Sequence, residues 1–187
     1  LKKEYNNFYN DEVEEIKKKY GKFIFIPSIF SRLHLGMPDV PPSWGRDYML
    51  SNYDDQKNLE IKLKEFLSFF PNKYKDIKIL LKPHPLGSKE YWKDIIQKIN
   101  CKNFLLADSK FSTNAYLLAC EFSVSSNCTT AVESFFLEKP SVNLRARDED
   151  GLATSSLIRE ISSKEILDIK ELEKIIVEWF YENKKFS

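Results

Sequence analysis

Two short segments of the chain carry side chains suited to holding a phosphate group. The first is Lys82-Pro83-His84-Pro85, where a proline on each side stiffens the backbone that presents the imidazole. The second is the run 125–130, Ser-Ser-Asn-Cys-Thr-Thr, which is dense in hydroxyl groups. Hydroxyls and free N–H groups at the start of a helix favour anions without any need for glycine. We therefore interpret both segments as candidate phosphate-binding segments.

The candidate ligands from these segments are Lys82, His84, Ser125, Ser126, Asn127, Thr129 and Thr130. Glu133 lies one turn into the following helix, where a carboxylate can accept hydrogen bonds from a ribose diol or simply stabilise the first turn. Ser28 follows the apolar run 23–26 and is a further candidate, because a small hydroxyl at such a turn can face a ligand. The structural alternatives stay open: a loop histidine packed on a neighbour, an ordinary capped helix and a solvated loop.

The elements that carry these segments are predicted to form an α/β domain. An unbroken apolar run, typical of a strand buried on both faces, occurs at 23–26, and further strands are predicted at 77–81, 103–106, 122–125 and 141–144. Helices are expected at 4–20, 54–70, 88–99, 112–119, 129–137 and 169–181, with the pair Phe135/Phe136 in the core. This alternation predicts a Rossmann-like, doubly wound parallel sheet, in which ligands bind at the carboxyl ends of the strands.

A long loop is predicted at 28–53, where proline and glycine are frequent. Asp39 and Asp47 in this loop are candidates for a catalytic base or nucleophile. Arg145, Arg147 and the acidic run 148–150 follow the last predicted strand. We interpret them as solvated charges, with contact to a sugar or a partner domain as the open alternative.

The composition excludes several classes of protein. The chain has 187 residues with 29 Lys and Arg against 28 Asp and Glu, a formal net charge of +1 that argues against bulk nucleic-acid binding. The 5 glycines form no G-x-x-x-x-G-K or G-x-G-x-x-G motif, and 3 cysteines with 2 histidines lack the usual zinc spacing. No metal is expected. The chain begins Leu1-Lys2-Lys3, which we interpret as a piece of a longer protein.

The Lys-Pro-His-Pro segment together with 126–140, which contains Cys-Thr-Thr-Ala-Val-Glu, resembles bacterial surface carbohydrate biosynthesis proteins. These look like glycosyltransferases of the two-domain GT-B type, and the resemblance covers residues 22–145. Related motifs occur in bacterial sialyltransferases, capsule Kdo transferases and CDP-glycerol glycerophosphotransferases. The chain departs from the pattern at Ser125-Ser126, where His-Asn is frequent, and at Glu138, where glycine usually precedes Lys-Pro.

The resemblance implies that the chain is one half of a GT-B fold, with residues 1–21 as a linker helix and 22–187 as the donor-binding domain. It implies that His84 contacts the donor phosphate, that the hydroxyls of run 125–130 complete the cradle and that Glu133 lies near the ribose. The implied activity is transfer of a sugar from a nucleotide-activated donor, with a CMP-linked donor favoured, in capsule or lipopolysaccharide synthesis.

The sequence is also compatible with two other functions: a polyol-phosphate transferase that uses a CDP-linked donor, and a nucleotide-binding α/β module without catalysis. The expected partners are the nucleotide-sugar donor, a glycan or glycolipid acceptor and an N-terminal acceptor domain, with no nucleic acid and no cofactor. The cysteine usage, without a secretory signal, favours a cytoplasmic location, with attachment to the inner face of the membrane as an open alternative.

Overall fold

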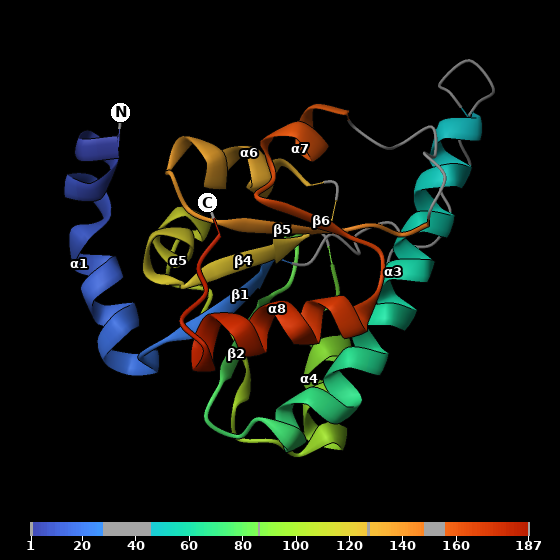
Figure 1. Cartoon of the computed structure of the whole chain (residues 1–187), viewed down its shortest axis with the longest axis horizontal. Helices are drawn as coiled ribbons and strands as arrows, with labels where there is room; N and C mark the ends of the chain where they lie inside the picture. The colour runs from blue at the N-terminus through green and yellow to red at the C-terminus, as the bar shows by residue number, and fades with distance from the viewer. Residues whose placement is uncertain (1, 28–45, 86, 127, 148–155, 187) are drawn as a thin grey trace.

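The computed structural model describes residues 2–27, 46–85, 87–126, 128–147 and 156–186 (Figure 1). Within these ranges the centre is a parallel sheet of six strands in the order β3-β2-β1-β4-β5-β6. The strands are β1 (Phe23–Pro27), β2 (Lys78–Lys82), β3 (Phe104–Leu106), β4 (Phe122–Ser125), β5 (Ser141–Leu144) and β6 (Lys164–Ile166). This order is that of a doubly wound Rossmann sheet, so the predicted fold class is confirmed.

Helices cover both faces of the sheet (Figure 1). They are α1 (Lys2–Tyr20), α3 (Arg46–Lys73), α4 (Lys89–Ile99), α5 (Thr113–Ala119), α6 (Thr129–Phe136), α7 (Ser156–Ile161) and α8 (Ile169–Tyr181). Helices α3, α4 and α8 pack on one face around a large apolar core, whereas α1 and α5 build a second core on the other face. Helices α6 and α7 lie on the side of α5, opposite α8 (Figure 1).

Strand β1 explains why an apolar run without alternation predicts a buried strand. Phe23 and Phe25 enter the core on the α1 and α5 side, whereas Ile24 and Ile26 enter the core on the α3 side. All four side chains are buried because helices cover both faces.

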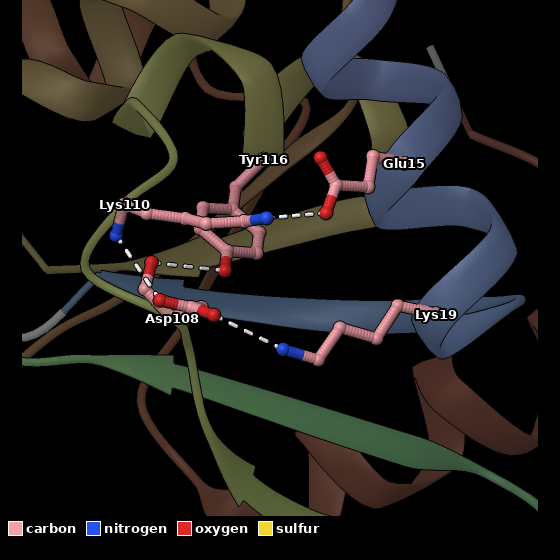
Figure 2. Close-up of polar contacts among 5 residues, drawn as sticks. All are labelled: Glu15, Lys19, Asp108, Lys110 and Tyr116. Carbon is pink, nitrogen blue, oxygen red and sulfur yellow. Dashed lines mark hydrogen bonds and ion pairs between the residues drawn. The ribbon is translucent and has the colours of Figure 1, made fainter.

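Helix α1 is attached to the loop between β3 and α5 by polar contacts (Figure 2). Lys19 Nζ lies 3.0 Å from a carboxylate oxygen of Asp108, and Lys110 pairs with Glu15. Asp108 also accepts a hydrogen bond from the backbone N–H of Lys110, and its carbonyl accepts one from the Tyr116 hydroxyl at 3.1 Å. The division into a linker helix and a domain at residue 21 stays a prediction.

Three details of the predicted elements are wrong. Helix α3 begins at Arg46 and continues through Pro71 to Lys73, so the second part of the predicted loop 28–53 is helical. The short elements α7 and β6 were not predicted. Phe135 and Phe136 are 53% and 62% exposed rather than in the core, because α6 turns its small residues Thr130, Ala131 and Ser134 toward the sheet.

The end of α6 departs from the usual glycine cap. Glu138 has φ of +52°, in the left-handed region where a side chain costs free energy. The conformation lets the N–H of Lys139 donate to the carbonyl of Ser134 at 2.9 Å, and that of Glu138 to the carbonyl of Phe135 at 3.0 Å. These bonds satisfy carbonyls that the end of a helix leaves free.

Replacing Glu138 with glycine is therefore expected to raise the free energy of unfolding by about 0.5–1 kcal/mol, because glycine adopts this φ without steric cost. Urea denaturation followed by circular dichroism measures the change. Glu138→Ala removes the carboxylate but keeps the Cβ atom, so it should give no such gain. Equal stabilisation by both variants would assign the effect to the carboxylate instead.

Candidate functional site

The candidate site lies where the connections from two adjacent strands leave on opposite faces of the sheet. Strands β1 and β4 are neighbours, and the chain leaves β4 into α6 on one face, whereas α3 lies on the other. In doubly wound sheets such a switch point opens a crevice at the carboxyl ends of the strands. Ser125 is the last residue of β4, and α6 begins at Thr129.

The residue at the N-cap position of α6 makes no side-chain cap hydrogen bond. That residue is Cys128, rather than one of the hydroxyl-bearing residues around it. Asn127 lies outside the described residues. A thiol is only a weak hydrogen-bond acceptor, so Cys128 does little to offset the partial positive charge at the helix start. Such a helix start is suited to an anion.

Two buried hydroxyls beside this helix start have no hydrogen-bond partner within the described ranges. Ser125 Oγ and Thr130 Oγ1 belong to side chains that are only 3% and 9% exposed. Neighbouring hydroxyls are satisfied: Ser134 Oγ donates to the carbonyl of Thr130 at 2.8 Å, and Ser126 Oγ donates to the carbonyl of Leu144 at 2.5 Å. Leaving a buried hydroxyl unsatisfied costs about 1–3 kcal/mol, so these two groups could each form a further hydrogen bond.

Glu133 lies one turn into α6, as predicted from its spacing. Its side chain is half-buried, and desolvation raises the pKa of the carboxyl above its ordinary value of 4.5. The charged form is therefore less favourable in the folded protein than in the unfolded chain.

The stability of the protein is expected to depend on pH through Glu133. The carboxyl binds its proton more tightly in the folded state, so stability falls as pH rises from the ordinary pKa through the raised one. Glu133→Gln should unfold at the same temperature as the original protein below about pH 4 and at a higher temperature at pH 7. Thermal unfolding across this range measures the difference, and a constant difference at every pH would contradict the assignment.

The Lys-Pro-His-Pro segment lies at the end of β2. Lys82 Nζ donates to the carbonyl of Phe111 at 2.5 Å and lies 5.2 Å from the ring centre of Tyr116. Burial lowers the pKa of this ammonium group. The structure thus gives Lys82 a packing role toward α5. His84 is half-buried, and its carbonyl accepts a hydrogen bond from Gly87 in a tight turn.

Of the remaining predicted site residues that the structure describes, only Thr129 lies at this helix start. Thr129 is exposed on the first turn of α6, and Asp47 is exposed on the first turn of α3, in a helix rather than a loop. Ser28 and Asp39 lie outside the described residues. The binding and catalytic roles of these residues, and of the two predicted segments, stay predictions.

A pocket that sequence reasoning missed lies between α3 and the end of β5. It is an open pocket, whose space of about 470 Å³ includes bulk solvent, and Ser126 connects it to the start of α6. Its lining residues are Asn52, Asp55, Gln56, Leu59, Ser126, Asn143, Leu144, Arg145, Ala146 and Arg147. The position of Arg145 and Arg147 after a strand was the available signal. The α3 residues of the pocket gave no such signal, because the sequence predicted their segment as part of a loop and the first turns of a helix.

Within the ranges that the structure describes, no three His, Cys, Asp or Glu side chains gather as a metal site would require. Nor does any described helix combine the length and the apolar character needed to cross a membrane.

No protein-family model matches the sequence, and no curated protein matches it. Two solved structures share its fold at 12% identity. The C-terminal CMP-Kdo binding domain of WaaA from Acinetobacter baumannii aligns with a TM-score of 0.55 over 94% of this chain and 91% of that domain. UDP-GlcNAc 2-epimerase from Methanocaldococcus jannaschii, solved with UDP-GlcNAc and UDP, aligns with a TM-score of 0.52 over 100% of this chain and 47% of the epimerase.

A glycosyl transferase family 9 protein from Veillonella parvula aligns at 0.47 over 45% of its length, also at 12% identity. The chain thus spans about half the length of the epimerase and of this transferase, and nearly all of the CMP-Kdo binding domain. The fold is the Rossmann-like half-domain of GT-B proteins, as predicted, and the resemblance to this class is confirmed at the level of the fold.

Proposed function

We propose that this chain is the donor-binding half of a GT-B glycosyltransferase and that the start of α6 binds the phosphate of a nucleotide-sugar donor. The observation that carries this proposal is the pair of buried hydroxyls of Ser125 and Thr130, which have no hydrogen-bond partner among the described residues and lie beside the start of α6. Phosphate oxygens accept hydrogen bonds from hydroxyls and are attracted to the positive end of a helix.

The same groups would assist the transfer step. When the bond between the sugar and the phosphate breaks, negative charge grows on the departing phosphate oxygen. Fixed donors and a helix dipole aimed at that oxygen lower the energy of the transition state. His84, at the end of β2, would donate to the same phosphate from the other side of β1, and Glu133 would accept from the ribose. The base that activates the acceptor would be Asp39, Asp47 or a residue of a second domain.

The structural neighbours support a nucleotide-sugar donor. One neighbour is named as a CMP-Kdo binding domain, and another was solved with UDP-GlcNAc and UDP. The sequence motifs favour a CMP-linked donor and a role in surface polysaccharide synthesis. The acceptor, a glycan or glycolipid, and the acceptor-binding domain belong to the same proposal.

Calorimetric titration with CMP, CDP, UMP, UDP and GDP tests this proposal. We expect the cytidine nucleotides to bind most tightly, and His84→Ala to weaken their binding. Tighter binding of UDP would contradict the cytidine preference, and no binding of any nucleotide would contradict the function. CDP-glycerol added to the same panel separates a polyol-phosphate donor from a CMP-linked sugar.

A further inference from the structure

The pocket between α3 and the end of β5 has walls of two kinds. Seven polar residues line it: Asn52, Asp55, Gln56, Ser126, Asn143, Arg145 and Arg147. Apolar wall is supplied by Leu59, Leu144 and Ala146. A sugar ring has the same two kinds of surface, with hydroxyl groups at its edge and C–H bonds on its faces.

Each arginine of the pocket wall is paired with a carboxylate. Arg147 Nε donates to Asp55 Oδ1 at 2.6 Å, and the same guanidinium donates to the carbonyl of Ser51 at 3.3 Å. Arg145 Nη1 lies 3.3 Å from a carboxylate oxygen of Glu165 outside the pocket. Because each arginine already faces a carboxylate, the pocket does not require a charged ligand.

The amide side chains carry both donors and acceptors. Gln56 and Asn143 are buried, and Gln56 Nε2 donates to Asn52 Oδ1 at 2.9 Å. An amide matches a hydroxyl group, which also donates and accepts at once. Three amides around one pocket therefore favour a ligand with several neighbouring hydroxyls over an apolar or purely anionic ligand.

The end of β5 is held against α3 in a fixed position. Lys62 Nζ, on α3, donates to the carbonyls of Arg145 and Leu167, both at 2.9 Å. Desolvation lowers the pKa of this ammonium group, as expected for a partly buried cation. The pocket wall is thus preorganised, which reduces the entropy lost on binding.

We infer that this pocket binds a sugar ring, and that the ring is the transferred sugar of the donor. Ser126 belongs both to the pocket and to the segment between β4 and α6, so a phosphate at the start of α6 and a sugar in the pocket would be neighbours. The assignment of this ring to the donor, and not to the acceptor, rests on the proposed function. An acceptor sugar would have the same chemistry, and the experiment separates the two.

The side-chain amide signals of Asn52, Gln56 and Asn143 in a ¹H–¹⁵N NMR spectrum report the pocket directly. UDP-GlcNAc and CMP-N-acetylneuraminate are titrated as donors, CMP and UDP as bare nucleotides, and methyl glycosides of neutral hexoses as free sugars. We expect at least one nucleotide sugar to move these three signals, whereas its bare nucleotide moves only backbone signals at the start of α6.

The outcomes for the pocket and for the proposed function are distinct. Bare nucleotides that move the pocket amides as much as nucleotide sugars do, or nucleotide sugars that bind without moving them, would overturn the sugar pocket. Methyl glycosides that move the amides while nucleotide sugars do not would overturn the donor assignment in favour of an acceptor sugar. Binding of methyl glycosides without binding of any nucleotide would overturn the proposed function, whereas the inference that the pocket binds a sugar ring would still hold.

Substitutions give a second measurement. Arg147→Ala and Asn52→Ala are each expected to weaken binding of the nucleotide sugar about fivefold and to leave binding of the bare nucleotide within twofold. Lys73→Ala is the matched control, because it breaks an ion pair with Glu173 at the other end of α3. Equal losses for sugar-bearing and bare nucleotides, or no loss in either pocket variant, would overturn the inference.

Discussion

Thr130→Val is expected to make the protein more stable and, at the same time, at least tenfold weaker in nucleotide binding. Thr130 Oγ1 is buried without a partner in the described part of the chain, and valine has nearly the same shape with a methyl group in place of the hydroxyl. The substitution removes an unsatisfied polar group at little cost in packing. We expect a gain of about 1 kcal/mol in the free energy of unfolding.

The loss of binding has the same origin as the gain in stability. A hydroxyl that has no partner in the free protein is available to a phosphate oxygen, and a hydrogen bond to a charged group contributes about 1.5–3 kcal/mol. Its removal corresponds to a ten- to hundredfold loss of affinity. Thermal unfolding and calorimetric titration with CMP measure the two effects on the same samples.

Ser134→Ala is the matched control for this prediction. Ser134 is also a buried hydroxyl of α6, but it donates to the carbonyl of Thr130 and lies 3.1 Å from Ser123 Oγ. Its removal should destabilise the protein and leave nucleotide affinity unchanged. If Thr130→Val lowers stability as Ser134→Ala does, the hydroxyl of Thr130 has a structural partner. If the Thr130→Val variant binds CMP as tightly as the original protein, the hydroxyl of Thr130 is not a phosphate ligand.

The sequence predicted β1 and β2 well because both strands are apolar on both faces, whereas β4 and β5 bury polar residues between apolar ones. β1 and β2 have no polar alternation, and helices cover both of their sides. The short strand β6 has the sequence Lys-Glu-Ile, with only Ile166 buried, so no apolar run marked it. The start of α3 was not predicted because the segment 46–53 follows a stretch of sequence rich in proline and glycine and lacks a clear apolar stripe.

The candidate site was predictable only in part. The dense hydroxyl run identified the segment before α6. Residue types alone, however, do not show which hydroxyls have hydrogen-bond partners in the folded protein. Ser126 and Ser134 have partners, whereas Ser125 and Thr130 have none in the described structure. The pocket depends on contacts between residues about ninety positions apart, such as Asp55 and Arg147. Such pairings follow from the packing of α3 beside β5, which no local pattern predicts.

Tyr116→Ala is expected to lower the free energy of unfolding by about 3–5 kcal/mol, the range typical of large aromatic residues removed from a core. The Tyr116 ring is fully buried on α5 and stacks on the ring of Phe25 with centres 5.2 Å apart. It also meets the edges of Phe23 and Phe111 at 6.3 and 6.0 Å. The second core, between the sheet and helices α1 and α5, therefore has this ring at its centre.

The hydroxyl of Tyr116 contributes a smaller share, which Tyr116→Phe isolates. That hydroxyl donates to the carbonyl of Asp108, the residue whose carboxylate also binds Lys19 of α1 (Figure 2). A loss of one such hydrogen bond costs about 1 kcal/mol, so the phenylalanine variant should keep most of the stability. Urea denaturation measures both variants. Because α1 packs on α5 through the same core, Tyr116→Ala should also expose α1 to proteolysis before the sheet unfolds. Equal losses in the two variants would assign the stability to the Asp108 contact rather than to the buried ring.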